Sequence, residues 1–542
     1  MIRTVVYLAA TAAFALTPPS CIAQSDPKLP FPQNRVRDFY FRQAEQFFDQ
    51  RPSGPVDVLA QFPGLDGGGF GHWGQNPEEV SFDHSMNDVD TGNVVCQITH
   101  HFGQTTPKGV NVLIDSATKT SVLFDPQKLT FIDSWTGGFV KWGFVRLGLM
   151  GGVEADGQRF IDFRGTAWQL PSNTPSRYLG FYRRGEHVAF ASQIGTGRVL
   201  DSCIVADGRL VRTLQLDGSL PASTFLKLIV PEAGSSITEN VGETGPNTTV
   251  THDSRSLRIG LSESVTGAKL AIVDGAIGVH FDGSPVTEPV QIQFTAFNAD
   301  TKAPPVIAKT IDVPNPAEIT AIVTENQSQT TYETSGLRGS SSGPLAIDSI
   351  TLPHGESNPY KSAMRIGGLG CLSDGRVVVS TLMGEIWLVD GIDGIASGTP
   401  LRWQRIAAGF YQALGIVIQD DRILVLGSDQ ITRLHDLNGD NEADFYECVT
   451  NNYPTTGGHD FCTSLQQDDS GRLYWAISSG DFGVARMGSD SVIESLGNGL
   501  RNSNGIGVSR DGSVVFATVQ EGTWTPASAI FEVKDHSYHG LK

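Results

Sequence analysis

The clearest candidate for chemistry is a twelve-residue run of oxygen-bearing side chains from Asp436 to Glu447. Its spacing is that of a calcium loop, in which positions 1, 3, 5, 9 and 12 offer side-chain oxygens and position 7 offers a backbone carbonyl. Hard oxygen ligands at alternate positions suit the large, flexible shell of this cation. The predicted metal ligands are Asp436, Asn438, Asp440, Glu442, Asp444 and Glu447.

The sixth position of this loop is Asn441, where calcium loops usually carry glycine. Asparagine enters the left-handed backbone region more readily than most residues, so the turn can still form. No amphipathic helix flanks the loop, which predicts an insertion between two strands and a structural role for calcium. The alternative is an acidic, solvated turn that binds no metal.

Two other segments match functional motifs in sequence but lack the secondary structure that those motifs require. Gly69, Gly71 and Gly74 match the spacing of a dinucleotide-binding loop, but the residues that follow are a poor start for the helix such a loop requires. The segment from Gly339 to Gly343 matches a nucleophile elbow, but it lies in a serine-rich stretch and not between a strand and a helix. Neither motif predicts an active site.

Composition restricts the classes of partner and cofactor. Acidic residues outnumber basic ones by 58 to 39, and the resulting net charge of −19 disfavours nucleic acid and anionic membranes as partners. No Cys-x-x-Cys-His motif occurs among the six cysteines, so we expect no covalent haem in this chain.

The N-terminus has the pattern of a secretory signal over residues 1–23. Arg3 provides the positive start, Thr4 to Leu16 the apolar run, and Cys21 to Ala23 the small-residue exit. The protein is therefore predicted to be exported, to the periplasm or beyond the cell, without a transmembrane span. A lipid-anchored form at Cys21 is disfavoured, because Pro18 to Ser20 does not match the residues that usually precede a lipidated cysteine.

Short β-branched runs between frequent glycines and prolines predict a mainly β fold. The one helical pattern runs from Arg35 to Phe48, and Thr324 to Gly343 has the composition of a linker or long loop. We expect N-terminal β-rich domains followed by a partial β-propeller. The predicted units are a signal at 1–23, an uncharacterised domain at 24–165, a sandwich-like β region with its linker at 166–345, and about four propeller blades at 346–542.

The blades are predicted from a repeated turn followed by an aliphatic run. The second residues of the four turns, at 375, 421, 471 and 512, are 46, 50 and 41 residues apart, close to the length of one propeller blade. The turns begin at Asp374, Asp420, Ser470 and Asp511.

The C-terminal part, from about residue 345 to 542, resembles the propeller domain of large membrane-bound dehydrogenases of planctomycetes and verrucomicrobia, themselves similar to soluble glucose and sorbosone dehydrogenases. The segments that carry the likeness are Gly384–Gly391, Gln430–Asp440, Gly499–Gly505 and Trp524–Ser528. Three earlier segments resemble the uncharacterised domain (DUF6797-like) that precedes that propeller. They are Phe62–Gly74, Trp135–Phe139 and Tyr178–Gly185.

The resemblance implies pyrroloquinoline quinone as cofactor and a sugar or related alcohol as substrate. It places His459 as the general base and Arg501 beside the developing negative charge, with Asn502 and Asn504 on the cofactor-facing loop. An electron-accepting cytochrome would be a partner. On this hypothesis the chain is a shortened relative of larger, haem-containing proteins.

A second hypothesis is a non-catalytic, calcium-stabilised binding or scaffold propeller. Asn504 stands where the related enzymes carry glutamine, and the turn expected before Glu521 is replaced by Ala517 to Gln520. His459 and Arg501 would then be structural residues between blades. The sequence leaves both hypotheses open.

Overall fold

The computed structural model describes most of the chain beyond residue 88. The described ranges are 89–143, 151–242, 245–261, 265–300, 309–322, 330–339, 348–353, 358–362, 364–455, 461–478, 482–520 and 528–540. The predicted signal, the helix expected at 35–48, the glycine-rich segment 62–74 and His459 lie outside these ranges.

The first sheet has seven strands in the order β5-β6-β1-β2-β3-β4-β7. They are β1 (Val94–His101), β2 (Gln104–Asp115), β3 (Thr120–Asp125), β4 (Thr130–Thr136), β5 (Val140–Trp142), β6 (Val153–Ala155) and β7 (Gln158–Arg159). Phe102 and Gly103 join β1 to β2 with φ of 44° and 84°, the two-residue turn that matches the twist of a hairpin. Because β3 is buried along its whole length, the sheet is covered on both faces.

Two further sheets follow, in the orders β14-β15-β16-β19-β12-β11-β10-β9 and β17-β18-β13-β8. Their strands are β8 (Ala167–Gln169), β9 (Ser176–Arg184), β10 (His187–Ile194), β11 (Gly197–Ala206), β12 (Arg209–Asp217), β13 (Thr224–Ile229), β14 (Ser236–Gly242), β15 (Gly245–His252), β16 (Arg255–Leu261), β17 (Ala268–Val273), β18 (Ala276–Phe281) and β19 (Val290–Asn298). The short helix α3 (Pro316–Ile319) packs on β9 to β12. Apolar residues of both sheets join those of β1 to β4 in one core, so this region does not pack separately from the first sheet.

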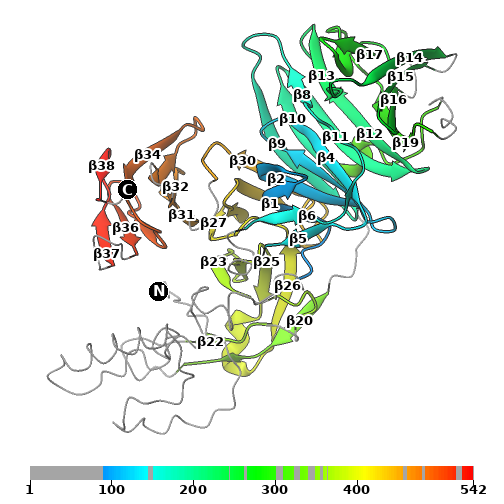
Figure 1. Cartoon of the computed structure of the whole chain (residues 1–542). Helices are drawn as coiled ribbons and strands as arrows, with labels where there is room; N and C mark the ends of the chain where they lie inside the picture. The colour runs from blue at the N-terminus through cyan, green and yellow to red at the C-terminus, as the bar shows by residue number, and fades with distance from the viewer. Residues whose placement is uncertain are drawn as a thin grey trace, which may run out of the picture.

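Four groups of three or four consecutive antiparallel strands form the C-terminal part, shown from yellow to red in Figure 1. Their strands are β23 (Ile366–Cys371), β24 (Val377–Thr381), β25 (Ile386–Asp390) and β26 (Leu401–Ala407); β27 (Gly415–Gln419), β28 (Arg422–Leu426), β29 (Ile431–His435) and β30 (Phe445–Thr450); β31 (Cys462–Gln467), β32 (Leu473–Ile477), β33 (Gly483–Met487) and β34 (Ile493–Asn498); and β35 (Ile506–Val508), β36 (Val515–Val519) and β37 (Ala529–Glu532). The 3-10 helix η2 (Ile392–Ser397) lies between β25 and β26, and β38 (Ser537–Tyr538) pairs with β34. Each of the four predicted turns joins the first and second strands of one sheet.

The first strands of these sheets stack on one another, β23 against β27, β27 against β31 and β31 against β35. Glycine permits this close approach. A Cβ atom on Gly367 would lie 2.1 Å from the carbonyl oxygen of Ala413, and one on Gly415 would lie 2.5 Å from the backbone nitrogen of Leu465. Stacking through the first strand is how propeller blades are arranged, so the mainly β fold with propeller blades is as the sequence predicts.

The second blade continues the sheet of the preceding domain. Strand β30 pairs antiparallel with β9, which makes one twelve-stranded sheet (Figure 1). Phe445 stacks on Tyr182 with ring centroids 4.1 Å apart, and Tyr446 stacks on Phe181 at 4.5 Å. The first two blades and the N-terminal sheets therefore share one hydrophobic core.

The linker expected at Thr324–Gly343 is wrong for residues 331–334 and 336–337, which form strands. Strand β20 (Thr331–Thr334) pairs with β26 at the outer edge of the first blade, and β21 (Gly336–Leu337) pairs with β22 (Ser349–Ile350). The polar composition hid these strands, because an edge strand is held by backbone hydrogen bonds and needs few apolar side chains. The expected boundary at 345 separates β20 from its own sheet.

Buried polar groups fix β2 to the second and third blades. Lys108 Nζ donates to the carbonyl oxygens of Asn451 (2.5 Å) and Tyr453 (2.6 Å), and it lies 5.0 Å from the Tyr453 ring centroid. Burial raises the pKa of Asp429 to about 6, although the charge of Lys108 acts in the opposite direction. A carboxyl group in this position makes the junction sensitive to pH.

We predict that Gly180→Ala destabilises the fold by about 2–4 kcal/mol, through strain and overpacking. Gly180 lies in β9 with φ of 120°, and an added Cβ would lie 2.0 Å from the carbonyl oxygen of Tyr446 in β30. Gly185→Ala is the matched control, because Gly185 also has positive φ (56°) but an added Cβ meets nothing within 4 Å. Denaturant unfolding measures both variants, and equal losses would contradict the close contact between β9 and β30.

We also predict that the native protein loses stability when the pH rises from 4 to 6. Asp429→Asn should remove this loss. The folded pKa of about 6 exceeds the ordinary 3.8, so the folded state holds a proton that the unfolded state has released. The free energy of unfolding of the native protein should fall by about 2 kcal/mol over this range, at about 1.4 kcal/mol per pKa unit. The difference between the two proteins isolates this group, and parallel pH profiles would show that Asp429 is not buried as described.

Candidate functional site

The loop between β29 and β30 forms the turn that the sequence predicts. Asp436 Oδ1 accepts from the backbone nitrogens of Gly439 (2.7 Å) and Asp440 (3.3 Å), and its Oδ2 accepts from that of Asn441 (2.8 Å). Asn441 has φ of 65°, which is the left-handed conformation expected for it. The first half of the loop is thus organised by its own side-chain oxygens.

Three carboxylates of the loop lie close enough to affect one another. Burial raises the pKa of Asp444, and the negative charges of Asp440 and Asp436 raise it further, against the hydrogen bond from Leu437 N. That bond, from Leu437 N to Asp444 Oδ2, is 2.7 Å long. A cation between these groups would remove their repulsion.

The last predicted ligands have other partners. Glu447 Oε2 lies 2.7 Å from His435 Nε2 and accepts from Arg433 Nη1 at 3.1 Å. Burial pushes the pKa of Glu447 upward, but His435 and Arg433 outweigh it and leave the pKa below its ordinary value. Glu442 Oε1 lies 3.3 Å from Arg183 Nη1. The chain as described contains no ready cluster of three or more His, Cys, Asp or Glu side chains that could hold a metal.

The oxygens of Asp436, Asn438, Asp440 and Asp444 are chemically suitable ligands for calcium, because each is a hard oxygen donor on one short loop. Asn438 Oδ1 accepts from Asp440 N at 3.0 Å, within the same turn. Glu447 does not fit in its present arrangement, because its carboxylate is already paired with Arg433 and lies within hydrogen-bond distance of His435.

The candidate cofactor loop, Gly499–Gly505, leads into β35. Arg501 is partly buried, and its carbonyl oxygen accepts from Gln520 N at 3.0 Å. Asn502 has φ of 42° and donates from Nδ2 to Gln520 Oε1 at 2.9 Å. Asn504 is exposed. The loop is therefore held against the end of β36.

The same loop is also tied to the preceding blade. Thr463 Oγ1 donates to the carbonyl oxygen of Ser503 at 2.5 Å, and Ser464 Oγ donates to that of Asn504 at 3.1 Å. Both donors lie at the start of β31, a few residues after His459 in the sequence. His459 itself lies outside the described residues, so its distance to Arg501 stays untested.

Thr106, His101 and Asp133 are hydrogen-bonded in series, as the nucleophile, base and acid of a catalytic triad are. His101 Nε2 lies 3.1 Å from Thr106 Oγ1, and Nδ1 lies 2.9 Å from Asp133 Oδ2. The three residues are only 4%, 3% and 1% exposed, so no substrate can reach the hydroxyl group. We assign them to the structure of the first sheet.

A chain of ion pairs that was not predicted from the sequence leads from this cluster to the surface. Asp133 Oδ2 accepts from Arg159 Nη2 at 2.8 Å. Arg159 Nη1 and Arg164 Nη2 both donate to Asp162 Oδ2, each at 2.8 Å. The alternating charges at 159–164 were the available signal, but nothing in the sequence shows that they meet His101.

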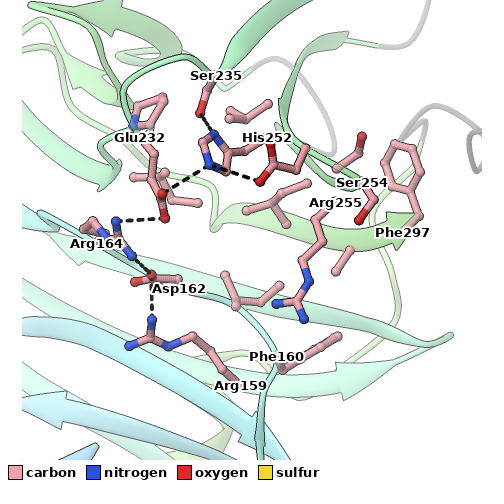
Figure 2. Close-up of a pocket in the computed structure, with 18 of the residues that line it drawn as sticks. Arg159, Phe160, Asp162, Arg164, Glu232, Ser235, His252, Ser254, Arg255 and Phe297 are labelled. Carbon is pink, nitrogen blue, oxygen red and sulfur yellow. Dashed lines mark hydrogen bonds and ion pairs between the residues drawn. The ribbon is translucent and has the colours of Figure 1, made fainter. Parts of the chain in front are cut away.

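This chain of ion pairs lines a surface cavity of about 860 Å³, shown in Figure 2. Arg164 Nη1 lies 2.8 Å from Glu232 Oε1, and Glu232 Oε2 lies 3.4 Å from His252 Nε2. The cavity is bounded by residues from segments 159–164, 229–235, 250–257 and 296–298. Its volume is in the range of small-molecule sites.

Residues 122–201 match the model of a domain of unknown function, DUF6797. Two segments on which the resemblance was based, Trp135–Phe139 and Tyr178–Gly185, fall inside the match, whereas Phe62–Gly74 does not. The match crosses the boundary expected at 165. This agrees with the single hydrophobic core on both sides of that boundary.

No curated protein matches the chain significantly. Three solved structures are similar at low identity. A protein assigned as an oxidoreductase (glucose dehydrogenase) from Thermus thermophilus has a TM-score of 0.27 and 14% identity over 33% of this chain and 65% of its own. A protein assigned as a gluconolactonase has a TM-score of 0.24 and 9% identity over 32% and 67%.

The third structure is PorZ, a surface component of the type-IX secretion system of Porphyromonas gingivalis, with a TM-score of 0.21 and 10% identity over 79% of this chain and 59% of that one. The chain spans less than two thirds of the length of the Thermus protein. These TM-scores are too low to carry an argument about activity. Among the described residues, no helix is long and apolar enough to cross a membrane.

Proposed function

We propose that this protein is an exported, dehydrogenase-like propeller protein that oxidises a sugar or related alcohol with a bound quinone. The observation that carries the proposal is the attachment of the Arg501 loop to β31. Thr463, which follows His459 by four residues, donates to the carbonyl oxygen of Ser503, two residues after Arg501. The Arg501 loop is thus joined to β31, the strand that follows His459 in the sequence.

The chemistry needs one base, one positive group and a hydride acceptor. His459 would take the hydroxyl proton of the alcohol while hydride leaves its carbon, which forms the carbonyl product. Arg501 would balance the negative charge that develops on the acceptor. Pyrroloquinoline quinone, when bound, supplies the hydride acceptor, and a separate cytochrome would take the two electrons from its reduced form.

Calorimetric titration with pyrroloquinoline quinone tests this proposal. We expect saturable binding that Arg501→Ala and His459→Ala each weaken by about tenfold or more, since a charged or polar contact is lost. Arg510→Ala, at an exposed arginine in the next turn, is the matched control and should bind as the native protein does. Absence of saturable binding to the native protein would rule out the quinone-dependent activity.

A calcium-stabilised binding or scaffold protein without catalysis is the second candidate. The favouring observation is the Asp436–Glu447 loop, where Asp436 accepts from three backbone nitrogens and the charges of Asp436 and Asp440 raise the pKa of Asp444. On this proposal, calcium holds the loop and with it the β29–β30 hairpin. That hairpin carries the strand that pairs with β9.

Thermal unfolding with and without calcium tests the second candidate. Calcium at about a hundred times its dissociation constant should stabilise the protein by about 2.7 kcal/mol. Asp440→Asn should abolish this gain, because it keeps the acceptor oxygen for Glu442 N but removes the charge. Asp420→Asn, at a turn residue outside the loop, should leave it intact. A calcium effect that survives Asp440→Asn would place the cation elsewhere.

A further inference from the structure

The cavity beside the Arg159–His252 chain of ion pairs is distinct from the propeller loops and is formed by the domains that precede the blades. We infer that it binds an acidic saccharide, whose oxyanion pairs with Arg255 and whose hydroxyl groups bond to the wall of ion pairs. The inference is independent of the proposed function, because it concerns binding by other residues.

The wall presents donors and acceptors in alternation. Arg159, Asp162, Arg164, Glu232 and His252 follow one another through contacts of 2.8 to 3.4 Å, as the dashed lines in Figure 2 show. A hydroxyl group both donates and accepts, so a row of sugar hydroxyls can bond to carboxylates and guanidinium groups in turn. A ligand with donors alone or acceptors alone could bond to only half of the groups in this wall.

The Arg159 end of the wall is anchored in the core before any ligand arrives. Arg159 is anchored by Asp133, which is 1% exposed, and its guanidinium carbon lies 4.6 Å from the Phe102 ring centroid. Ser235 Oγ lies 3.3 Å from His252 Nδ1, which orients that imidazole ring. Groups already fixed in place lose little entropy on binding, which favours affinity.

Arg255 is an exposed arginine that lines the cavity. It lies at the start of β16, opposite His252 across the β15–β16 hairpin, and Figure 2 shows its guanidinium group pointing into the space between the walls. Within the described ranges, no hydrogen bond or ion pair involves its side chain. A guanidinium group pairs best with a planar or tetrahedral oxyanion, which predicts a carboxylate or sulfate on the ligand.

The rest of the lining suits a sugar ring and an extended ligand. Phe160 and Phe297 add apolar surface at two sides of the cavity, and Asn298 adds a further polar group. The protein carries a net charge of −19, so an anion would not gather here by general attraction. Recognition has to come from the local arrangement around Arg255.

Calorimetric titration with three probes tests the inference. No quinone is present, so a failure to bind saccharide would not bear on the proposed role of Arg501. The probes are an oligogalacturonate, a neutral oligosaccharide of equal length and a polyglutamate peptide of equal charge. We expect the oligogalacturonate to bind at least about tenfold more tightly than either of the others. A sulfated oligosaccharide in a fourth titration tells which oxyanion Arg255 prefers.

Arg255→Ala should weaken the acidic saccharide by about tenfold or more, and Arg255→Lys should restore part of the loss. The exposed Arg422 in β28 provides the matched control, Arg422→Ala, which should not change binding. Unchanged thermal unfolding of Arg255→Ala would show that its fold is intact. The inference is overturned by equal binding of polyglutamate, by binding that does not depend on Arg255, or by no binding of either acidic saccharide.

Discussion

The structure depends on the backbone pairing of β9 with β30. Through it, the sheet that begins at β14 in the N-terminal half runs without interruption into the second blade. Stacked aromatic rings on both faces of the pairing, Tyr182 with Phe445 and Phe181 with Tyr446, give the junction the packing of a domain interior. The calcium-type loop leads directly into β30, so its conformation and the position of β9 are linked.

The two candidate sites differ in the interactions that hold them. The Arg501 loop is held by hydrogen bonds from hydroxyl and amide side chains of neighbouring blades. One wall of the cavity near Arg255 is formed by ion pairs, and these are anchored in the core through the pair of Arg159 with Asp133. A substrate-binding domain rigidly attached to a catalytic propeller, or a binding protein with structural blades, are both compatible with this arrangement.

The features predicted from the sequence are those set by local chemistry. The turns at Asp374 and Asp511 and the left-handed Asn441 each follow from a few adjacent residues. Contacts between distant segments were not predictable in this way. Glu447 was assigned to calcium from spacing alone, but the register of β29 with β30 places it beside Arg433 and His435. Strand β20 was not predictable, because its composition is polar and its partner, β26, lies far along the chain.

Because the chain is synthesised from its N-terminus, β9 is made long before its partner β30. Gly180 pairs with Glu447, which is 267 residues later in the chain. At a translation rate of about 5–20 residues per second, the edge of β9 stays uncovered for at least about 13 s after it leaves the ribosome. An open strand edge is a template for pairing with another chain. Nascent copies that have not yet reached β30 are therefore the aggregation-prone species, and a holdase chaperone that covers β9 would raise the yield of native protein.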